Sequence, residues 1–269
     1  MKTPSSLRVG ILATGLIVLA SSVYAQGKVV VSHDEWFTGN GYFGNSAYGD
    51  GQQFLINTLN WFGSAPGQNV LVYSNNGFLD NSALLSYLSG TRGFNVTVYP
   101  SELATNFSLY NAILVGGNSS MDAAGLAAYV FGGGNVFVEG GTGAWSSASD
   151  EAFYNNIFLN AVGLGFDGRQ YNGLGTVTTV GFDGQGPFGG ALFAGVSSVY
   201  ANNGNNVLYA TAVNGVTDQV WVDGHGNGVF GAAEVTATPE PATLLLFGTG
   251  LGLTGLGVIR RRRRNKIEQ

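Results

Sequence analysis

A run of ionisable side chains, His33, Asp34 and Glu35, directly follows an apolar stretch, and Glu139 ends another. Carboxylates beside an imidazole can bind a metal ion or act as a general base. The same residue types also cap helices and satisfy loop backbone groups, and their spacing here matches no metal motif. The pattern favours the second interpretation, so we expect no metal and no cofactor.

Composition restricts the other catalytic sets. The 269 residues contain no cysteine, which excludes disulfides, thiolate zinc sites and cysteine nucleophiles. The second histidine, His225, falls in the stretch DGHGNG, which lacks the terminal glutamate of a calcium loop and is typical of a tight hairpin turn. No serine elbow G-x-S-x-G occurs. We therefore expect a non-catalytic protein; the alternative is an extracellular hydrolase that uses His33, Asp34, Glu35 and Glu139.

Five short apolar runs rich in β-branched residues must position these side chains. They cover residues 28–32, 69–74, 95–99, 112–117 and 135–141. Such runs suit strands buried on both faces, and helical patterns lie between most of them. The alternation predicts an α/β fold with a mainly parallel sheet and helices on both faces. Ligand sites are expected outside the carboxyl ends of the strands, which also carry Ser74-Asn75-Asn76 and Asn118-Ser119-Ser120.

The helices are predicted from apolar residues that recur on one face and from their caps. One helix is expected after a cap at Ser120 and ends at a triple glycine. Another is expected after Ser149, with Asp150 and Glu151 in its first turn. Its buried face is predicted to carry Phe153, Ile157, Phe158, Ala161 and Val162.

After Phe166 the strand-like segments are separated by Gly, Asn and Asp turns, with no strong helical pattern between them. They could extend the sheet as antiparallel edge strands or form a small β-subdomain. Because no linker interrupts the chain earlier, residues 26–235 are predicted to form one extracellular domain. A proline-rich linker begins at Thr236.

The amino terminus, residues 1–25, has the features of a secretory signal peptide. Lys2 and Arg8 precede an apolar core. Val23 and Ala25 occupy the small-residue positions of a signal peptidase site, which predicts cleavage between Ala25 and Gln26. An uncleaved membrane anchor is the alternative. Removal by signal peptidase predicts a mature protein that begins at Gln26, outside the cytoplasmic membrane.

The carboxyl terminus combines three features within residues 236–269. Pro239-Glu240-Pro241 is followed by an uncharged run, 242–259, which as a helix would be about 27 Å long and just cross a bilayer. Five arginines, Arg260, Arg261, Arg262, Arg263 and Arg264, open the basic tail 260–269 and would hold it in the cytoplasm. The run predicts a transmembrane helix.

These three features, in this order, resemble the PEP-CTERM sorting signal. The resemblance covers about Thr238 to Lys266. It implies that an exosortase recognises the segment, that membrane insertion is transient, and that the protein passes to the cell surface or extracellular matrix of a Gram-negative bacterium. It also implies an association with exopolysaccharide and biofilm.

The charge of the predicted domain restricts its partners. Between Gln26 and Thr238, fourteen acids face three basic residues, Lys28, Arg92 and Arg169. Such an acidic body repels phosphate backbones, so we expect no nucleic-acid partner. Exopolysaccharide is a candidate partner of the body.

The order of the elements over about residues 28–235 resembles the class I glutamine amidotransferase-like superfamily. The resemblance rests mainly on a strand that ends in Gly116-Gly117, a helix, a triple glycine and a second strand that ends in Glu139-Gly140-Gly141. It implies a three-layer, flavodoxin-like fold. Where the amidotransferases carry a cysteine nucleophile, this turn continues with Thr142, so we expect no glutaminase activity.

Overall fold

The computed structural model describes residues 26–74, 77–99, 106–117, 121–141, 147–171, 173–202 and 204–236. Its centre is a seven-stranded mixed sheet with the order β10-β11-β1-β5-β4-β2-β3. The parallel strands are β1 (Gln26–Ser32), β2 (Asn69–Ser74), β3 (Asn95–Val98), β4 (Ala112–Gly116) and β5 (Asn135–Glu139). They coincide with the five predicted runs, which confirms the mainly parallel α/β sheet.

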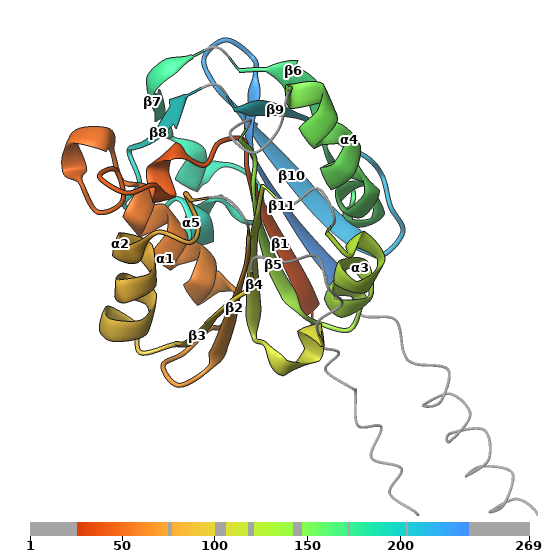
Figure 1. Ribbon diagram of the computed structural model, residues 1–269. Coiled ribbons are helices and arrows are strands. Elements are labelled where there is room, and N and C mark those ends of the chain that lie inside the picture. Colours follow the sequence, from red (N-terminus) through yellow and green to blue (C-terminus); the bar gives the residue numbers. More distant parts are fainter. Residues whose placement is uncertain are drawn as a thin grey trace, which may run out of the picture.

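Helices cover both faces of this sheet (Figure 1). One face carries α1 (Gly51–Trp61), α2 (Ser82–Ser86) and the short α5 (Gly189–Leu192); the other carries α3 (Ala123–Phe131) and α4 (Ala148–Leu159). Because side chains alternate along a strand, each strand contributes side chains to the hydrophobic core on both faces of the sheet. In β1, Val30 packs in the cluster with α1, whereas Val29 and Val31 pack in the cluster with α3 and α4.

The late strands adopt both predicted arrangements. β11 (Gly228–Thr236) pairs antiparallel with β1, and β10 (Val216–Val222) pairs antiparallel with β11, so these two extend the main sheet. Two separate pairs form small sheets: β6 (Leu164–Gln170) with β9 (Asn205–Ala210), and β7 (Leu174–Thr178) with β8 (Ser198–Asn202). The turn between β10 and β11 is the predicted hairpin, because the Asp223 carboxylate accepts hydrogen bonds from the backbone of His225 and Asn227, both at 2.9 Å.

Two predicted helix starts are wrong. The cap of α3 is Asp122, whose carboxylate accepts a hydrogen bond from Gly125 N at 2.8 Å; Ser120 lies outside the described residues. The cap of α4 is Ser147, so this helix begins two residues earlier than predicted from Ser149.

The predicted buried face of α4 is only partly right: Phe158 and Val162 are fully buried, but two of the predicted residues are exposed. Phe153 and Ile157 are 69% and 61% exposed. The buried face instead carries a mixture of small, polar and apolar residues: Ala148, Glu151, Ala152, Asn155, Phe158 and Leu159. Bulky apolar residues on the outer face therefore misled the assignment, and Glu151 faces the interior.

Candidate functional site

Four acids converge beyond the carboxyl ends of β1 and β5; we call Asp34, Glu35, Glu139 and Glu151 the acid cluster. Ser32 of β1 pairs with Glu139 of β5, so Asp34 and Glu35 follow at the same end of the sheet. The negative charges of Glu35 and Asp34 act on both Glu139 and Glu151. Three of the four were predicted as candidates. The structure brings them together and adds Glu151.

Asp34 closes the end of β1. One carboxylate oxygen accepts a hydrogen bond from Trp36 N at 2.8 Å, and the other accepts one from Asn202 N at 2.6 Å. The side chain is fully buried. Burial raises the pKa of Asp34 to about 7, against backbone hydrogen bonds that lower it. Asp34 thus ties β1 to the end of β8.

Glu139 is buried with one oxygen engaged. Its Oε2 accepts a hydrogen bond from the Thr38 hydroxyl at 3.1 Å, while Oε1 is buried and makes no hydrogen bond within the described part of the chain. Burial, followed by repulsion from Glu35 and Asp34, raises the pKa of Glu139 well above its usual range. At neutral pH this environment favours the protonated acid.

Glu151 joins the helix α4 to the end of β5. Its Oε1 accepts a hydrogen bond from Gly141 N at 2.7 Å, and Asn205 donates to the other oxygen. Burial raises the pKa of Glu151 well above its usual range. Sequence reasoning missed this residue as a site candidate. A signal existed in its spacing, because Glu151 stands seven residues before the buried Phe158 and so on the same helix face.

Close backbone approach seals the cluster. A Cβ on Gly141 would overlap the carboxyl group of Glu35, and a Cβ on Gly204 would overlap the carbonyl oxygen of His33. Only glycine leaves room for the turns after β5 and β8 to lie directly on the segment 33–35. The acids are accordingly 0–2% exposed.

His33 belongs to a neighbouring, separate environment. Its Nδ1 lies 2.8 Å from the carbonyl oxygen of Val229, and its ring packs edge-on against Tyr171 with centroids 4.7 Å apart. Burial lowers the pKa of His33 to about 4, so the imidazole is neutral. Among the described residues, no hydrogen bond or ion pair joins it to Asp34 or Glu139. The predicted set of His33 with these acids is therefore not assembled as an acid–base pair.

The chemistry open to the cluster follows from burial and protonation. A general base must be ionised and must reach a substrate, but all four acids are buried, and burial raises the pKa of Asp34, Glu139 and Glu151. Among the described residues, no group of three or more acids, histidines or cysteines is arranged to hold a metal ion. What the acids do is bind backbone amides, a hydroxyl and an amide side chain, which fixes the loops at this end of the sheet.

The other predicted polar residues at the strand ends are only partly described. The Ser74 hydroxyl donates a hydrogen bond to Gly116 O at 2.8 Å and so joins β2 to β4. Asn75, Asn76 and the segment 118–120 lie outside the described residues.

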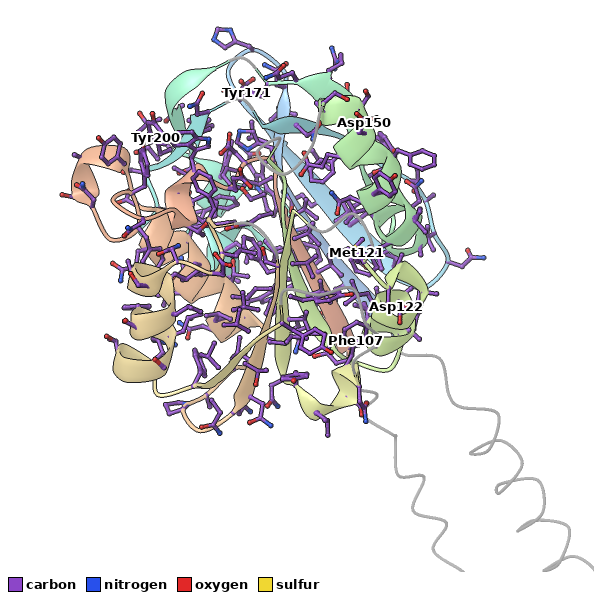
Figure 2. All side chains as sticks on the ribbon, viewed as in Figure 1. Phe107, Met121, Asp122, Asp150, Tyr171 and Tyr200 are labelled. Carbon is purple, nitrogen blue, oxygen red and sulfur yellow. The ribbon has the colours of Figure 1, made fainter. Side chains whose placement is uncertain are left out.

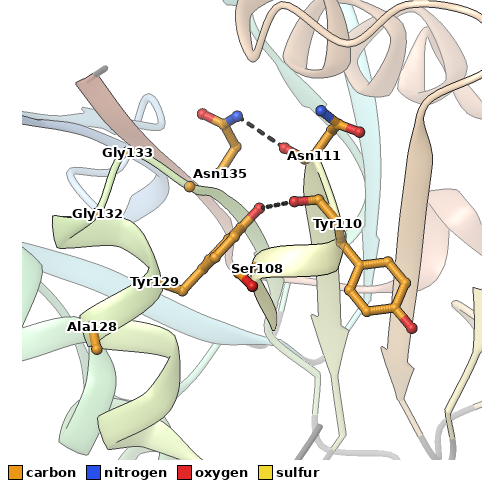
Figure 3. Close-up of a pocket in the computed structure, with 9 residues that line it drawn as sticks. Ser108, Tyr110, Asn111, Ala128, Tyr129, Gly132, Gly133 and Asn135 are labelled. Carbon is orange, nitrogen blue, oxygen red and sulfur yellow. Dashed lines mark hydrogen bonds between the residues drawn. The ribbon is translucent and has the colours of Figure 1, made fainter. Parts of the chain in front are cut away.

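An open cleft of about 360 Å³ lies at the opposite end of the sheet, where β4 and β5 begin (Figure 3). Its polar groups are engaged with the chain. The Tyr129 hydroxyl donates to Tyr110 O at 3.0 Å, and Asn135 donates to Asn111 O at 2.9 Å. Burial raises the pKa of Tyr129 to about 12, so its hydroxyl stays protonated. The cleft is lined by neutral groups and offers no catalytic set.

The predicted sorting residues lie outside the described ranges. These are Ala25, the motif Pro239-Glu240-Pro241, the run 242–259 and Arg260 to Arg264. In the part that the structure describes, no helix is long and apolar enough to span a bilayer. Gln26, the predicted first residue of the mature protein, opens β1 and pairs with Thr236, the first residue of the predicted linker.

Comparisons with protein-family models, curated proteins and solved structures find no match. The fold places the chain in the class of α/β proteins with a mainly parallel sheet.

Proposed function

We propose that the protein is an exported, non-catalytic surface or extracellular-matrix protein whose α/β body binds or organises exopolysaccharide. The proposal that the protein is non-catalytic rests on the burial and the hydrogen bonds of the acid cluster. Its acids are buried, and Asp34, Glu139 and Glu151 each accept hydrogen bonds from loop groups, as residues that hold a scaffold together do.

The finer fold proposal is a flavodoxin-like, three-layer arrangement without amidotransferase chemistry. In its favour, the strand order β3-β2-β4-β5 matches the first four positions of the flavodoxin-like order 2-1-3-4-5. The fifth position is taken by β1, the first described strand, and the antiparallel β11 and β10 continue the sheet beyond it. The position of β1 therefore differs from the flavodoxin-like order. Because β5 and β4 lie between β1 and β2 in the sheet, the connection from β1 to β2 must cross both strands.

The export proposal rests on the two ends of the sequence. A cleaved signal peptide would deliver the body outside the cytoplasmic membrane, and 242–259 would stall in the bilayer with Arg260 to Arg264 inside. This places Pro239-Glu240-Pro241 at the outer face, where the prolines forbid regular helix and keep the strip extended. An exosortase cleft can then pair with that strip.

Replacing Pro239 and Pro241 by alanine tests this proposal. The variant is expected to keep its carboxyl-terminal tail and stay in the membrane fraction. The unaltered protein is expected in the surface or matrix fraction, shortened at both ends. Cell fractionation with mass spectrometry of the termini measures both. Pro66→Ala, at an exposed proline of the body, is the matched control and should be processed normally. A double variant that reaches the matrix with the same shortened terminus would contradict the sorting proposal.

The alternative, an extracellular hydrolase, is favoured by one observation: Asp34, Glu35 and Glu139 lie in one cluster. Paired carboxyl groups are the apparatus of glycoside hydrolysis. Release of reducing sugar from a matrix polysaccharide by the purified protein, abolished by Glu139→Gln while the fold is retained, would support this alternative over the non-catalytic one.

A further inference from the structure

Five aromatic rings gather where the segment after β1 meets β8; we call Trp36, Tyr42, Tyr48, Phe78 and Tyr200 the aromatic platform. Each is only partly buried. They come from three parts of the chain: the segment 36–48, Phe78 and Tyr200. Tyr200 of β8 lies on the side of the molecule where the segment 39–50 projects (Figure 2). Most other phenylalanines in the described part of the chain are buried in the core, whereas these five rings are grouped near the surface.

The rings contact one another as a continuous set. Tyr42 is stacked on Tyr200 with centroids 5.1 Å apart and planes inclined by 23°. Tyr48 lies 4.6 Å from Tyr42 and 5.1 Å from Tyr200. Trp36 lies 5.0 Å from Tyr42 and 5.2 Å from Phe78. Such ring–ring contacts restrict each side chain, so a ligand would meet a preformed surface.

The segment that carries Tyr42 and Tyr48 is fixed to β8 by Asp50. The Asp50 carboxylate accepts hydrogen bonds from the amide and the hydroxyl of Ser197, at 2.9 and 2.6 Å. Asp50 N donates to Ser198 O at 2.7 Å, and Gly49 forms a bridge with Val199. The platform is therefore held by backbone pairing as well as by the rings.

The polar groups of the platform are neutral and available. Within the described ranges, no hydrogen bond engages the hydroxyls of Tyr42, Tyr48 and Tyr200. Tyrosine offers a large apolar ring with a hydroxyl that both donates and accepts. This combination suits a pyranose ring, which presents apolar C–H groups on its faces and hydroxyls around its edge.

The charge near the platform disfavours an acidic ligand. The three basic residues of the body are engaged elsewhere: Lys28 donates to Trp61 O at 2.6 Å, Arg92 donates to Asn60 at 2.7 Å, and Arg169 pairs with Asp167. Among the described residues, the carboxylates of Asp50 and Asp80 each stand two positions after a platform residue, Tyr48 and Phe78. A polyuronate or sulfated polymer would meet repulsion without a compensating cation.

We propose that the aromatic platform binds a neutral polysaccharide by stacking sugar rings on Tyr42, Tyr200 and Trp36. This inference rests on the proposed function, because it names the class of polymer that the exported body would meet. It assigns binding to the platform, separate from the acid cluster.

Affinity electrophoresis of the detergent-solubilised full chain tests the proposal. The probes are three neutral polymers (laminarin, hydroxyethylcellulose and dextran), with alginate as the acidic polymer. We expect retardation by at least one neutral polymer and none by alginate. Tyr42→Ala and Tyr200→Ala should each weaken the binding about tenfold or more, as removal of a central aromatic contact does. Phe153→Ala, at an exposed aromatic residue of α4, is the matched control and should leave binding unchanged.

Tyr42→Phe keeps the ring and guards against a simple loss of folding. It should retain most of the binding, and its thermal unfolding should match that of the unaltered chain. Binding to no neutral polymer, binding to alginate instead, or neutral-polymer binding that Tyr42→Ala and Tyr200→Ala leave unchanged would each overturn the proposal. Self-association that these variants abolish, without any glycan binding, would identify a second copy of the chain as the occupant instead.

The outcome is distinguishable from failure of the proposed function. The double variant Tyr42→Ala/Tyr200→Ala should still lose its carboxyl-terminal tail and reach the cell surface. It should then be washed from the matrix more readily than the unaltered protein. Normal processing without any glycan binding would reject the platform alone, whereas unprocessed protein would reject the sorting proposal.

Discussion

Replacing Glu139 by glutamine is expected to stabilise the fold at neutral pH and to leave it nearly unchanged in acid. Glutamine has the shape of the protonated acid and can still accept the hydrogen bond from the Thr38 hydroxyl, which is 3.1 Å long in the structure. It cannot ionise in the unfolded chain. The variant therefore removes the penalty of burying a group that water would ionise.

The size of the effect follows from linkage. Burial raises the folded-state pKa of Glu139 well above the ordinary value of 4.5. The unfolded chain then releases this proton first as the pH rises, so the free energy of unfolding is highest below pH 4.5 and falls until the folded pKa is reached. The slope is about 1.4 kcal/mol per pH unit for one group. Between pH 5 and 7, the unaltered protein should lose at most about 2.7 kcal/mol that the variant keeps.

Other buried groups also make the free energy of unfolding depend on pH. Their contributions are the same in the variant and in the unaltered protein, so they cancel when the two are compared. Asp34, with a folded pKa of about 7, also lowers the stability as the pH rises from 3.8 to 7. His33, with a folded pKa of about 4, acts in the opposite direction between pH 4 and 6.5, because its unfolded form binds more protons there. The difference between the variant and the unaltered protein isolates Glu139.

Urea unfolding followed by tryptophan fluorescence at pH 5, 6, 7 and 8 measures this difference. With a urea m-value of about 1–3 kcal/mol/M, the midpoint of the variant should lie roughly 1 M higher at pH 7. Glu234→Gln, on the partly exposed β11 position, controls for the loss of one negative charge. A Glu139→Gln protein that is less stable at every pH, or whose advantage shrinks as the pH rises, would refute the reasoning.

Two further substitutions test how the loops are held. Gly204→Ala should lower the free energy of unfolding by about 1–3 kcal/mol, because the new Cβ would overlap the His33 carbonyl oxygen; Gly184→Ala, in open space, should have little effect in the same urea titration. Asp50→Ala should increase amide hydrogen exchange across residues 42–49 and weaken neutral-glycan binding several-fold. Since hydrogen bonds from Ser197 lower the pKa of Asp50 below 3.8, this anchor should persist at pH 5 in the unaltered protein and be lost only as the pH falls through that lowered value.

The sheet could be predicted from sequence because its strands carry their own signal. Continuous β-branched runs such as 69–74 and 112–117 have few alternatives to a buried strand. The strands β6 and β8 were not predicted, because glycine interrupts LGFDGRQ and SVYAN is short and mixed. The buried face of α4 was predicted only in part: Phe158 is buried, but Phe153 and Ile157 lie outside and outweighed the small residues that pack inside.

How far each site could be predicted depends on how far apart its residues lie in the sequence. The cluster of Asp34, Glu35 and Glu139 could be anticipated, because parallel strands end at one edge of the sheet. The burial of these acids could not be anticipated, because it depends on Gly141 and Gly204. These glycines are distant in sequence from residues 33–35 but pack directly against them. The aromatic platform has no local pattern either. Tyr42 and Tyr200 are 158 positions apart in the sequence, and the contacts of Gly49 and Asp50 with β8 and Ser197 bring their segments together.

The position of β11 has a mechanical consequence. This strand is paired along its length on both sides, with β1 from Gln26↔Thr236 to Ser32↔Phe230 and with β10 from Val216↔Val235 onward. A pull on Thr236 from a carboxyl-terminal tether, resisted by a polymer held at the far end of the sheet, would run along the strand axis. Both ladders would then be loaded in shear, so that their hydrogen bonds must yield together, whereas a pull across the strand would open them one at a time. The pairing of β11 on both sides would therefore resist a load applied along the strand better than one applied across it.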